Sequence, residues 1–199
     1  MILSAAWVIP VTSPPIRSGY VEIAEGRIVG VGASSGLPSA AGPVADLGAV
    51  VLTPGLVNPH THLELGCYAE QVQPAPFWSW IELLIRLRSR PGQRQREQRA
   101  AGEGAWQSLR AGVTCVGDIS RRNCAWPVLK RLPIRKVCFV ELLSLADHPP
   151  RNLDELREGV RSVVEDELLT VGVSPHTPYT VPDDQIRAAI ALADAIDRP

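Results

Sequence analysis

The sequence lacks the features that would place it in several large classes of protein. Its 20 basic and 21 acidic residues leave a formal net charge of -1, so it has no basic field that would attract nucleic acid. The apolar start, residues 1–8, has no positively charged flank and is interrupted at Pro10, so we expect neither a secretory signal nor a membrane span there. Hydrophobic residues at 45% and charged residues at 21% are ordinary for a globular chain.

Cysteine and lysine are also scarce. No Cys-x-x-Cys spacing links the four cysteines, so we expect reduced thiols and a cytoplasmic location; they are Cys67, Cys115, Cys124 and Cys138. Lys130 and Lys136 are the only lysines, and most basic residues are arginine. A cluster of these arginines is expected to form a solvated helix face: Arg86, Arg88, Arg90, Arg94, Arg96 and Arg99.

What the chain does contain is a pair of histidines at the end of an apolar run. Alternate side chains of an extended strand point the same way, so His60 and His62 leave one face together and could share one cation. Imidazole binds Zn²⁺, Fe, Ni and Cu, so the spacing indicates a metal without fixing its identity. A bare pair could also be a chance arrangement on a solvated strand edge. The preceding apolar residues 49–52, the Pro54-Gly55 break and a second apolar step favour a buried strand and a metal site.

The hydrophobic pattern divides the chain into two unequal parts. Residues 1–50 carry short alternating runs at 20–23 and 27–31, joined by a turn at 24–26, and a loop rich in turn-forming residues at 33–43. From residue 51 onward strands and helices alternate, which predicts a parallel sheet built from βα units. The expected strands are 50–58, 112–119, 136–143 and 169–174, and the expected helices are 76–89, 94–110, 124–132, 152–167 and 182–197.

Four segments together resemble the amidohydrolase superfamily of metal-dependent hydrolases. They are residues 26–32 (GRIVGVG), 52–62 (LTPGLVNPHTH), 112–118 (GVTCVGD) and 173–179 (VSPHTPY). The similarity is closest to the chlorohydrolase branch, which includes guanine, cytosine and S-adenosylhomocysteine deaminases. The PGLVNPHTH motif is highly specific, whereas the two later segments are supporting matches.

The resemblance implies an α/β fold. Residues 51–199 would be the first half, strands one to four, of a TIM (β/α)₈ barrel, and residues 1–50 would be part of a small β-sandwich domain. Because a closed barrel needs eight strands, we expect the barrel to be incomplete in this chain. Unpaired sheet edges then predict a homo-oligomer, or pairing with a chain that supplies the missing half-barrel.

The same resemblance implies roles for the histidine pair. His60 and His62 would bind one divalent metal ion, with Zn²⁺ favoured over Fe or Mn, and the metal would activate a water molecule. The family's third histidine and its proton-shuttling Glu and Asp would lie beyond Pro199, so the catalytic residues are left unassigned. Two-metal relatives use a lysine at the end of strand four, and neither lysine is near that position. A one-metal site is therefore expected.

Other polar residues are candidates for the rim of the site. His176 is expected to contact the substrate, as its counterpart does in related deaminases, or else to pack against Tyr179. Glu64 would share the face of the histidine pair if the strand continued that far, and could bind substrate or be an exposed rim carboxylate. Asp118 and Glu141 could line the pocket or could cap and pair within the rim.

Two further groups are interpreted as structural. His148 lies in a predicted loop and is expected at the surface. Phe77, Trp78 and Trp80 are expected in the core of the first helix, with a pocket wall as the alternative.

Two classes of function remain open from the sequence. The first is a metal-dependent hydrolase of non-peptide C–N bonds that deaminates a purine, pyrimidine or related heterocycle, with triazine dechlorination as a neighbouring reaction. The second is a non-enzymatic fragment that needs a second chain or the missing half. The first predicts a small-molecule substrate, and neither predicts nucleic acid or membrane as a partner.

Overall fold

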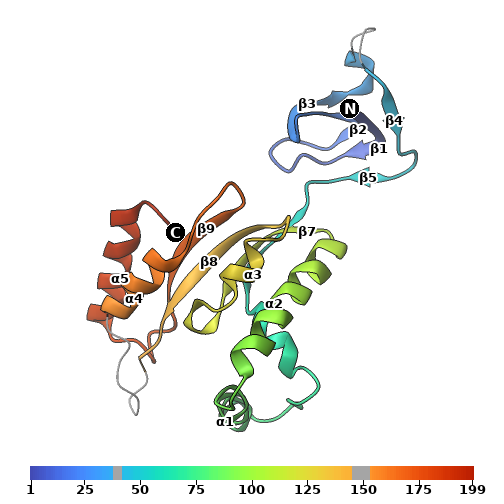
Figure 1. Ribbon diagram of the computed structural model, residues 1–199. Helices are drawn as coiled ribbons and strands as arrows, with labels where there is room; N and C mark the ends of the chain where they lie inside the picture. Colours follow the sequence, from blue (N-terminus) through green and yellow to red (C-terminus); the bar gives the residue numbers. More distant parts are fainter. Residues whose placement is uncertain (38–41, 145–152) are drawn as a thin grey trace. The chain divides into compact units, whose positions relative to one another are not determined.

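The computed structural model describes residues 1–37, 42–144 and 153–199 and separates into two compact units (Figure 1). Unit one spans Met1–Gly55 and unit two spans Leu56–Pro199. The division therefore falls five residues after the boundary that the sequence suggests. No helix among the described residues is long and apolar enough to cross a bilayer.

The N-terminal unit is a small, mostly antiparallel sheet. Its strands follow the order β3-β2-β1-β4, with β5 also paired to β1. The predicted hairpin is confirmed, because β2 and β3 pair antiparallel around a turn in which Glu25 and Gly26 have φ angles of 51° and 73°. The strands are β1 (Ile2–Val8), β2 (Ile16–Ala24), β3 (Arg27–Ala33), β4 (Val44–Asp46) and β5 (Val51–Leu52); a 3₁₀ turn, η1 (Ser34–Gly36), follows β3.

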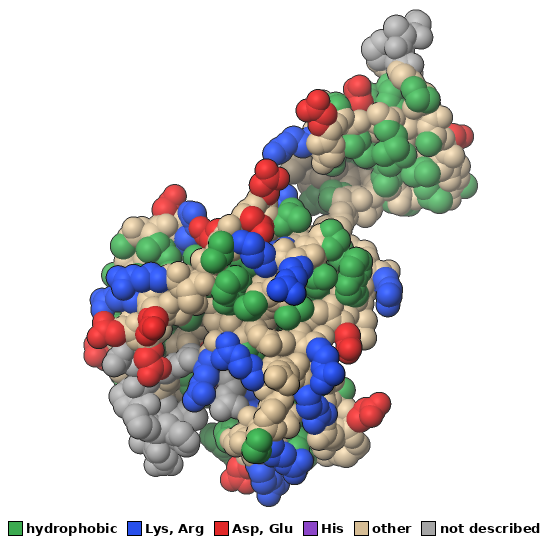
Figure 2. Space-filling model, in the orientation of Figure 1, with side chains coloured by type: hydrophobic (Ala, Val, Ile, Leu, Met, Phe, Trp, Pro, Cys, Tyr) green, Lys and Arg blue, Asp and Glu red, His purple; other side chains and the backbone are tan. Residues whose placement is uncertain are grey.

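The core of this unit is thin. Its buried apolar residues include Ile2, Ala5, Val8 and Val21. Several larger apolar side chains remain exposed, Ile28 at 63% and Val29 at 58% among them, and green side chains spread over the visible face of the unit in Figure 2. An apolar surface of this kind usually marks a face that packs against another element.

The second unit is built on a four-stranded parallel sheet in the order β6-β7-β8-β9. This confirms the predicted α/β architecture with its parallel strands. The strands are β6 (Leu56–Thr61), β7 (Val113–Ile119), β8 (Arg135–Leu142) and β9 (Leu169–Pro175). Because all four strands run the same way, the segments that follow them lie together at the carboxyl ends of the strands.

Helices connect the strands and cover the sheet. The five predicted helices are present, but two are shorter than expected: they are α1 (Phe77–Arg88), α2 (Gln93–Arg110), α3 (Trp126–Leu129), α4 (Leu153–Ser162) and α5 (Asp183–Ile196). Pro133 prevents α3 from extending further. Beyond α4 the Asp166 carboxylate accepts the N–H groups of Leu168 and Leu169, and this turn leads into β9.

The main core of the second unit lies where α4 and α5 pack on β8 and β9. Leu142, Leu169, Leu156 and Ala189 are buried in one apolar cluster there. The two edges of the sheet differ. Leu56 and Val57 of β6 are 60% and 63% exposed, whereas the outward N–H group of Val173 donates to the Pro199 carbonyl at 2.8 Å.

Candidate metal centre

The His-x-His pair lies where strand β6 ends. His60 is on the strand and is exposed, and His62 follows it, half-buried, immediately before the 3₁₀ segment η2 (Leu63–Tyr68). The two ring centroids are 5.3 Å apart, with an angle of 77° between the ring planes. The two imidazoles therefore lie side by side, as the alternation of a strand requires.

A neighbouring strand determines which nitrogen of His62 is available. The Nδ1 atom lies 2.6 Å from the carbonyl oxygen of Ile119, the last residue of β7. A carbonyl oxygen can only accept, so we assign the ring proton to Nδ1, which leaves the Nε2 lone pair free. Metal-binding histidines commonly have this arrangement, because the second hydrogen bond orients the ring and increases its basicity.

The approach of β7 to β6 depends on a glycine. A Cβ atom on Gly117 would collide with the Pro59 carbonyl group, one residue before His60. The His60 N–H group also donates to the Asn58 side-chain oxygen at 3.4 Å. The backbone that carries the histidines is thus held by contacts that only a residue without a side chain permits at position 117.

Asp118 fixes the chain just beyond His62. Its Oδ1 atom accepts the Leu63 N–H group at 3.1 Å, and the side chain is buried. Burial, and next the charge of Glu64, raise the pKa of Asp118 to about 7. Of the two roles considered for Asp118, the structure agrees with capping within the rim, not with an exposed pocket wall.

Glu64 requires a correction. The expectation that it continues the strand and points with the histidines is wrong, because β6 ends at Thr61 and Glu64 lies in η2. It is fully buried, so it is not an exposed rim carboxylate, and it has no exposed surface through which to contact a substrate. Its Oε1 atom accepts from Arg88 Nη2 at 2.9 Å.

Arg88 joins two buried carboxylates. Besides Glu64, it donates through Nε to Glu97 Oε1 at 2.9 Å, and its side chain is 14% exposed. The predicted solvated face is therefore wrong for Arg88, whereas the other five arginines of that cluster are exposed. Glu97 also accepts from the hydroxyl group of Tyr68 at 3.0 Å, and burial raises the pKa of Tyr68. This buried polar layer connects η2, α1 and α2.

The histidine after β9 is held by its own loop. The Nδ1 atom of His176 lies 2.7 Å from Thr180 Oγ1. The backbone N–H group of His176 donates to the Leu142 carbonyl at 3.0 Å. The hydrogen-bond partner of the His176 ring is Thr180, and Tyr179 is 76% exposed. The structure leaves the predicted substrate contact of His176 untested.

The remaining sequence candidates have separate outcomes. Phe77 and Trp78 are 56% and 72% exposed, so the predicted core position is wrong for both, while Trp80 packs against the small cluster around Tyr68. Glu141 lies on β8, in register with Ser174 of β9. His148 lies outside the described residues.

The described residues supply an incomplete set of metal ligands. No group of three His, Cys, Asp or Glu side chains gathers closely enough to hold a metal ion within residues 1–37, 42–144 and 153–199. Catalytic zinc sites commonly have three protein ligands and an open position for water. Two imidazoles, one with a defined free nitrogen, fit part of such a site.

Comparison with known proteins agrees with this arrangement. The sequence model of the Amidohydrolase family matches residues 51–199. The chain belongs to the amidohydrolase family. A 5'-deoxyadenosine deaminase of Methanothermobacter thermautotrophicus is 28% identical over 92% of this chain and 44% of its own length. The chain spans about half the length of the curated relatives it matches.

Solved structures show the same fold. An aminofutalosine deaminase of Helicobacter pylori, in complex with methylthio-coformycin, matches 99% of this chain and 49% of its own, with a TM-score of 0.85 and 23% identity. An atrazine chlorohydrolase of Arthrobacter aurescens, complexed with zinc, matches 98% of this chain and 51% of its own, with a TM-score of 0.80 and 19% identity. The predicted resemblance to the deaminase and chlorohydrolase branch, over an N-terminal half, is confirmed.

Proposed function

We propose that this chain forms the metal-binding part of a hydrolase that removes an amino group from an adenine nucleoside or a related heterocycle. The observation that carries the proposal is the hydrogen bond between His62 Nδ1 and the Ile119 carbonyl, which leaves Nε2 free on a ring whose centroid lies 5.3 Å from that of His60. Relatives named as deaminases of adenosine-like compounds support the substrate class.

In this proposal His60 and His62 hold one divalent ion, with zinc favoured. When bound, such an ion lowers the pKa of a water molecule toward ~7 and so provides a nucleophile at neutral pH. The chain's other residues orient the ligands: the Ile119 carbonyl fixes the ring of His62, and Asp118 holds the backbone at Leu63. His176 would orient the substrate. A third histidine and the proton-transferring carboxylates would come from a segment outside this chain or from a second chain.

The absence of a three-ligand group from the described residues favours a second possibility. The chain by itself would then be catalytically incomplete and would need a partner that supplies the other half of the barrel, in an assembly of identical or different chains. Triazine dechlorination stays a neighbouring alternative for the complete protein.

The test uses the complete protein, together with any second chain that completes the barrel. We expect it to release ammonia from adenosine or 5'-deoxyadenosine, to lose turnover after treatment with a chelator and to regain it with Zn²⁺. His62→Ala should abolish turnover because Nε2 is lost. Turnover that survives both chelation and His62→Ala would contradict the proposal.

A further inference from the structure

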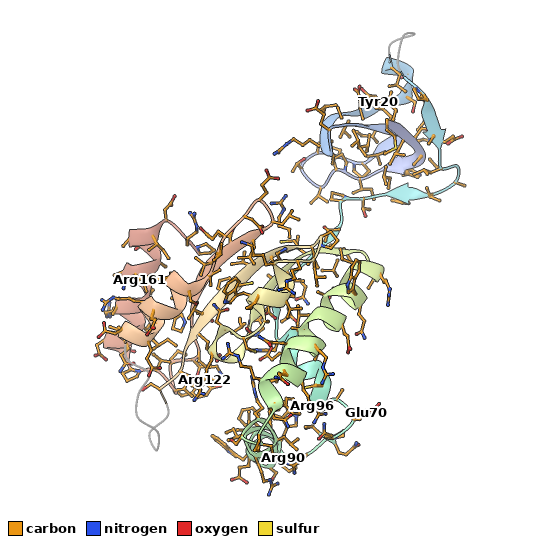
Figure 3. All side chains as sticks on the ribbon, viewed as in Figure 1. Tyr20, Glu70, Arg90, Arg96, Arg122 and Arg161 are labelled. Atoms are coloured by element: carbon orange, nitrogen blue, oxygen red, sulfur yellow. The ribbon has the colours of Figure 1, made fainter. Side chains whose placement is uncertain are left out.

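A cavity lined by arginines is formed by segments that follow β6 and β7, the two strands that position the histidine pair. Its volume is about 350 Å³, and it is bordered by the turn between α1 and α2 and by the turn after β7. Its lining includes Arg88, Arg90, Arg94 and Arg122. Figure 3 labels Arg90 and Arg122, and basic side chains gather over this part of the unit in Figure 2.

Three of these arginines have no partner of opposite charge within the part of the chain that the structure describes. Arg88 is committed to Glu64 and Glu97, as described above. By contrast, no hydrogen bond or ion pair involves the side chains of Arg90, Arg94 or Arg122 among the residues that the structure describes. The only acidic side chain in the lining is Glu97, and its charge is already paired.

The backbone at Arg122 is held in a costly conformation. Arg122 and Asn123 have φ angles of 48° and 49°, in the left-handed region of backbone conformation that residues other than glycine rarely adopt. The turn is secured by Ser120, which accepts the N–H group of Asn123 at 2.9 Å through its carbonyl and that of Ala125 at 3.1 Å through its hydroxyl. Strain of this kind persists where the surroundings enforce it and concentrates at functional sites.

The cavity and the histidine pair share structural supports. Arg122 follows Ile119, whose carbonyl orients His62, by three residues, and Arg88 in the cavity wall binds Glu64, two residues after His62. Both therefore belong to the segments that follow β6 and β7. A molecule whose reacting atom lies at the metal could extend toward these guanidinium groups.

We propose that this cavity binds an anionic substituent of the substrate, a carboxylate or a phosphate. Guanidinium groups bind both through paired, charge-assisted hydrogen bonds, and three groups without counterions favour an anion over a neutral ligand. The volume is within the range of small-molecule sites. The inference rests on the proposed function for the identity of the ligand as substrate, whereas the affinity of the cavity for an anion does not depend on it.

The direct test is calorimetric titration of the full-length protein with inorganic phosphate and with succinate, against chloride at the same ionic strength. We expect saturable binding of at least one anion, and its identity assigns the substituent to phosphate or carboxylate. Arg90→Gln with Arg94→Gln should raise the Kd at least about tenfold, because charge-assisted hydrogen bonds are lost. The matched control, Arg86→Gln with Arg99→Gln, changes net charge equally outside the cavity and should leave the Kd within about twofold.

Absence of saturable binding, or an equal loss in both double variants, would overturn the proposal. The substrate assignment has its own readout, the ratio of kcat/KM for an adenosine with a 5'-carboxylate or 5'-phosphate to that for adenosine. The cavity variant should lower this ratio about tenfold, and an unchanged ratio would refute the assignment to substrate. If no adenine nucleoside is deaminated, the proposed function fails while the titration still judges the cavity.

Discussion

Two buried regions of the second unit differ in how many charged side chains they contain. Where α4 and α5 cover β8 and β9, the core is apolar and includes Leu142, Leu156 and Leu169 (Figure 1). Around η2 the apolar side chains of Leu84 and Leu87 are buried together with several that carry polar or charged groups: Glu64, Tyr68, Gln93, Glu97 and Asp118. The first region follows the usual rule for protein interiors, and the second departs from it.

The difference indicates what each region is for. Apolar burial stabilises the fold without requiring particular partners, whereas each buried charge must be matched to offset its desolvation. The charged region adjoins His62, and its contacts hold Leu63 and Glu64 in place. We infer that polar burial is retained there because it positions the segment that carries the histidines.

Removal of Arg88, the cation that Glu64 and Glu97 share, should have the largest effect on stability. Arg88→Met removes the guanidinium group that the buried carboxylates of Glu64 and Glu97 share, so we expect a loss of roughly 3–5 kcal/mol in the free energy of unfolding. Urea denaturation measures this loss. Adding Glu64→Gln and Glu97→Gln should restore much of the stability, because no unpaired charge then remains.

The control is Arg86→Met, an exposed arginine on the same helix, which should change stability by less than ~0.5 kcal/mol. Equal effects of Arg88→Met and Arg86→Met would mean that the buried ion pairs contribute nothing.

The apolar region should respond through packing alone. Leu142→Ala is expected to cost roughly 2–5 kcal/mol by leaving a cavity, measured by the same denaturation experiment. Because Leu142 lies on β8, which does not pair with the strand that leads to His60 and His62, zinc content at a temperature where the variant is folded should equal that of the wild type. A folded variant that loses zinc would show that the two regions are not independent.

A smaller effect should appear in the pH dependence of the stability. The pKa of Asp118 is about 7 in the folded protein against an ordinary 3.8, so the neutral form is favoured by folding. Its contribution to stability is complete below about pH 4 and is lost as the pH rises through about 7. We therefore expect Asp118→Asn, which keeps an oxygen for the Leu63 N–H group, to remove part of the decrease in urea midpoint between pH 4 and pH 8. Identical pH profiles would contradict the raised pKa.

Features with a local cause could be predicted from the sequence. The spacing of His60 and His62 follows from the two-residue period of a strand, and four parallel strands follow from alternating apolar and helical segments. The hairpin at Glu25-Gly26 follows from its turn residues.

Features that depend on residues far away along the chain could not be predicted from the sequence. Residues 63–65 alternate as a strand would. However, Asp118, 55 residues away, accepts the Leu63 N–H group, and Arg88, 24 residues away, donates to Glu64. These contacts accompany a 3₁₀ turn and bury Glu64 and most of Arg88, which the sequence analysis places at the rim of the site and on a solvated helix face. The Ile119 carbonyl is equally invisible in the sequence, because any residue provides one; only its place at the end of the next strand marks it.

Zinc content tests the central claim, that His60 and His62 form a metal site, most directly. The wild-type full-length protein and a His176→Ala control should each contain about one zinc ion per chain by mass spectrometry, whereas His60→Ala with His62→Ala should contain almost none. Folding of the double variant is checked by circular dichroism. The same zinc content in the folded double variant and the wild type would contradict the account.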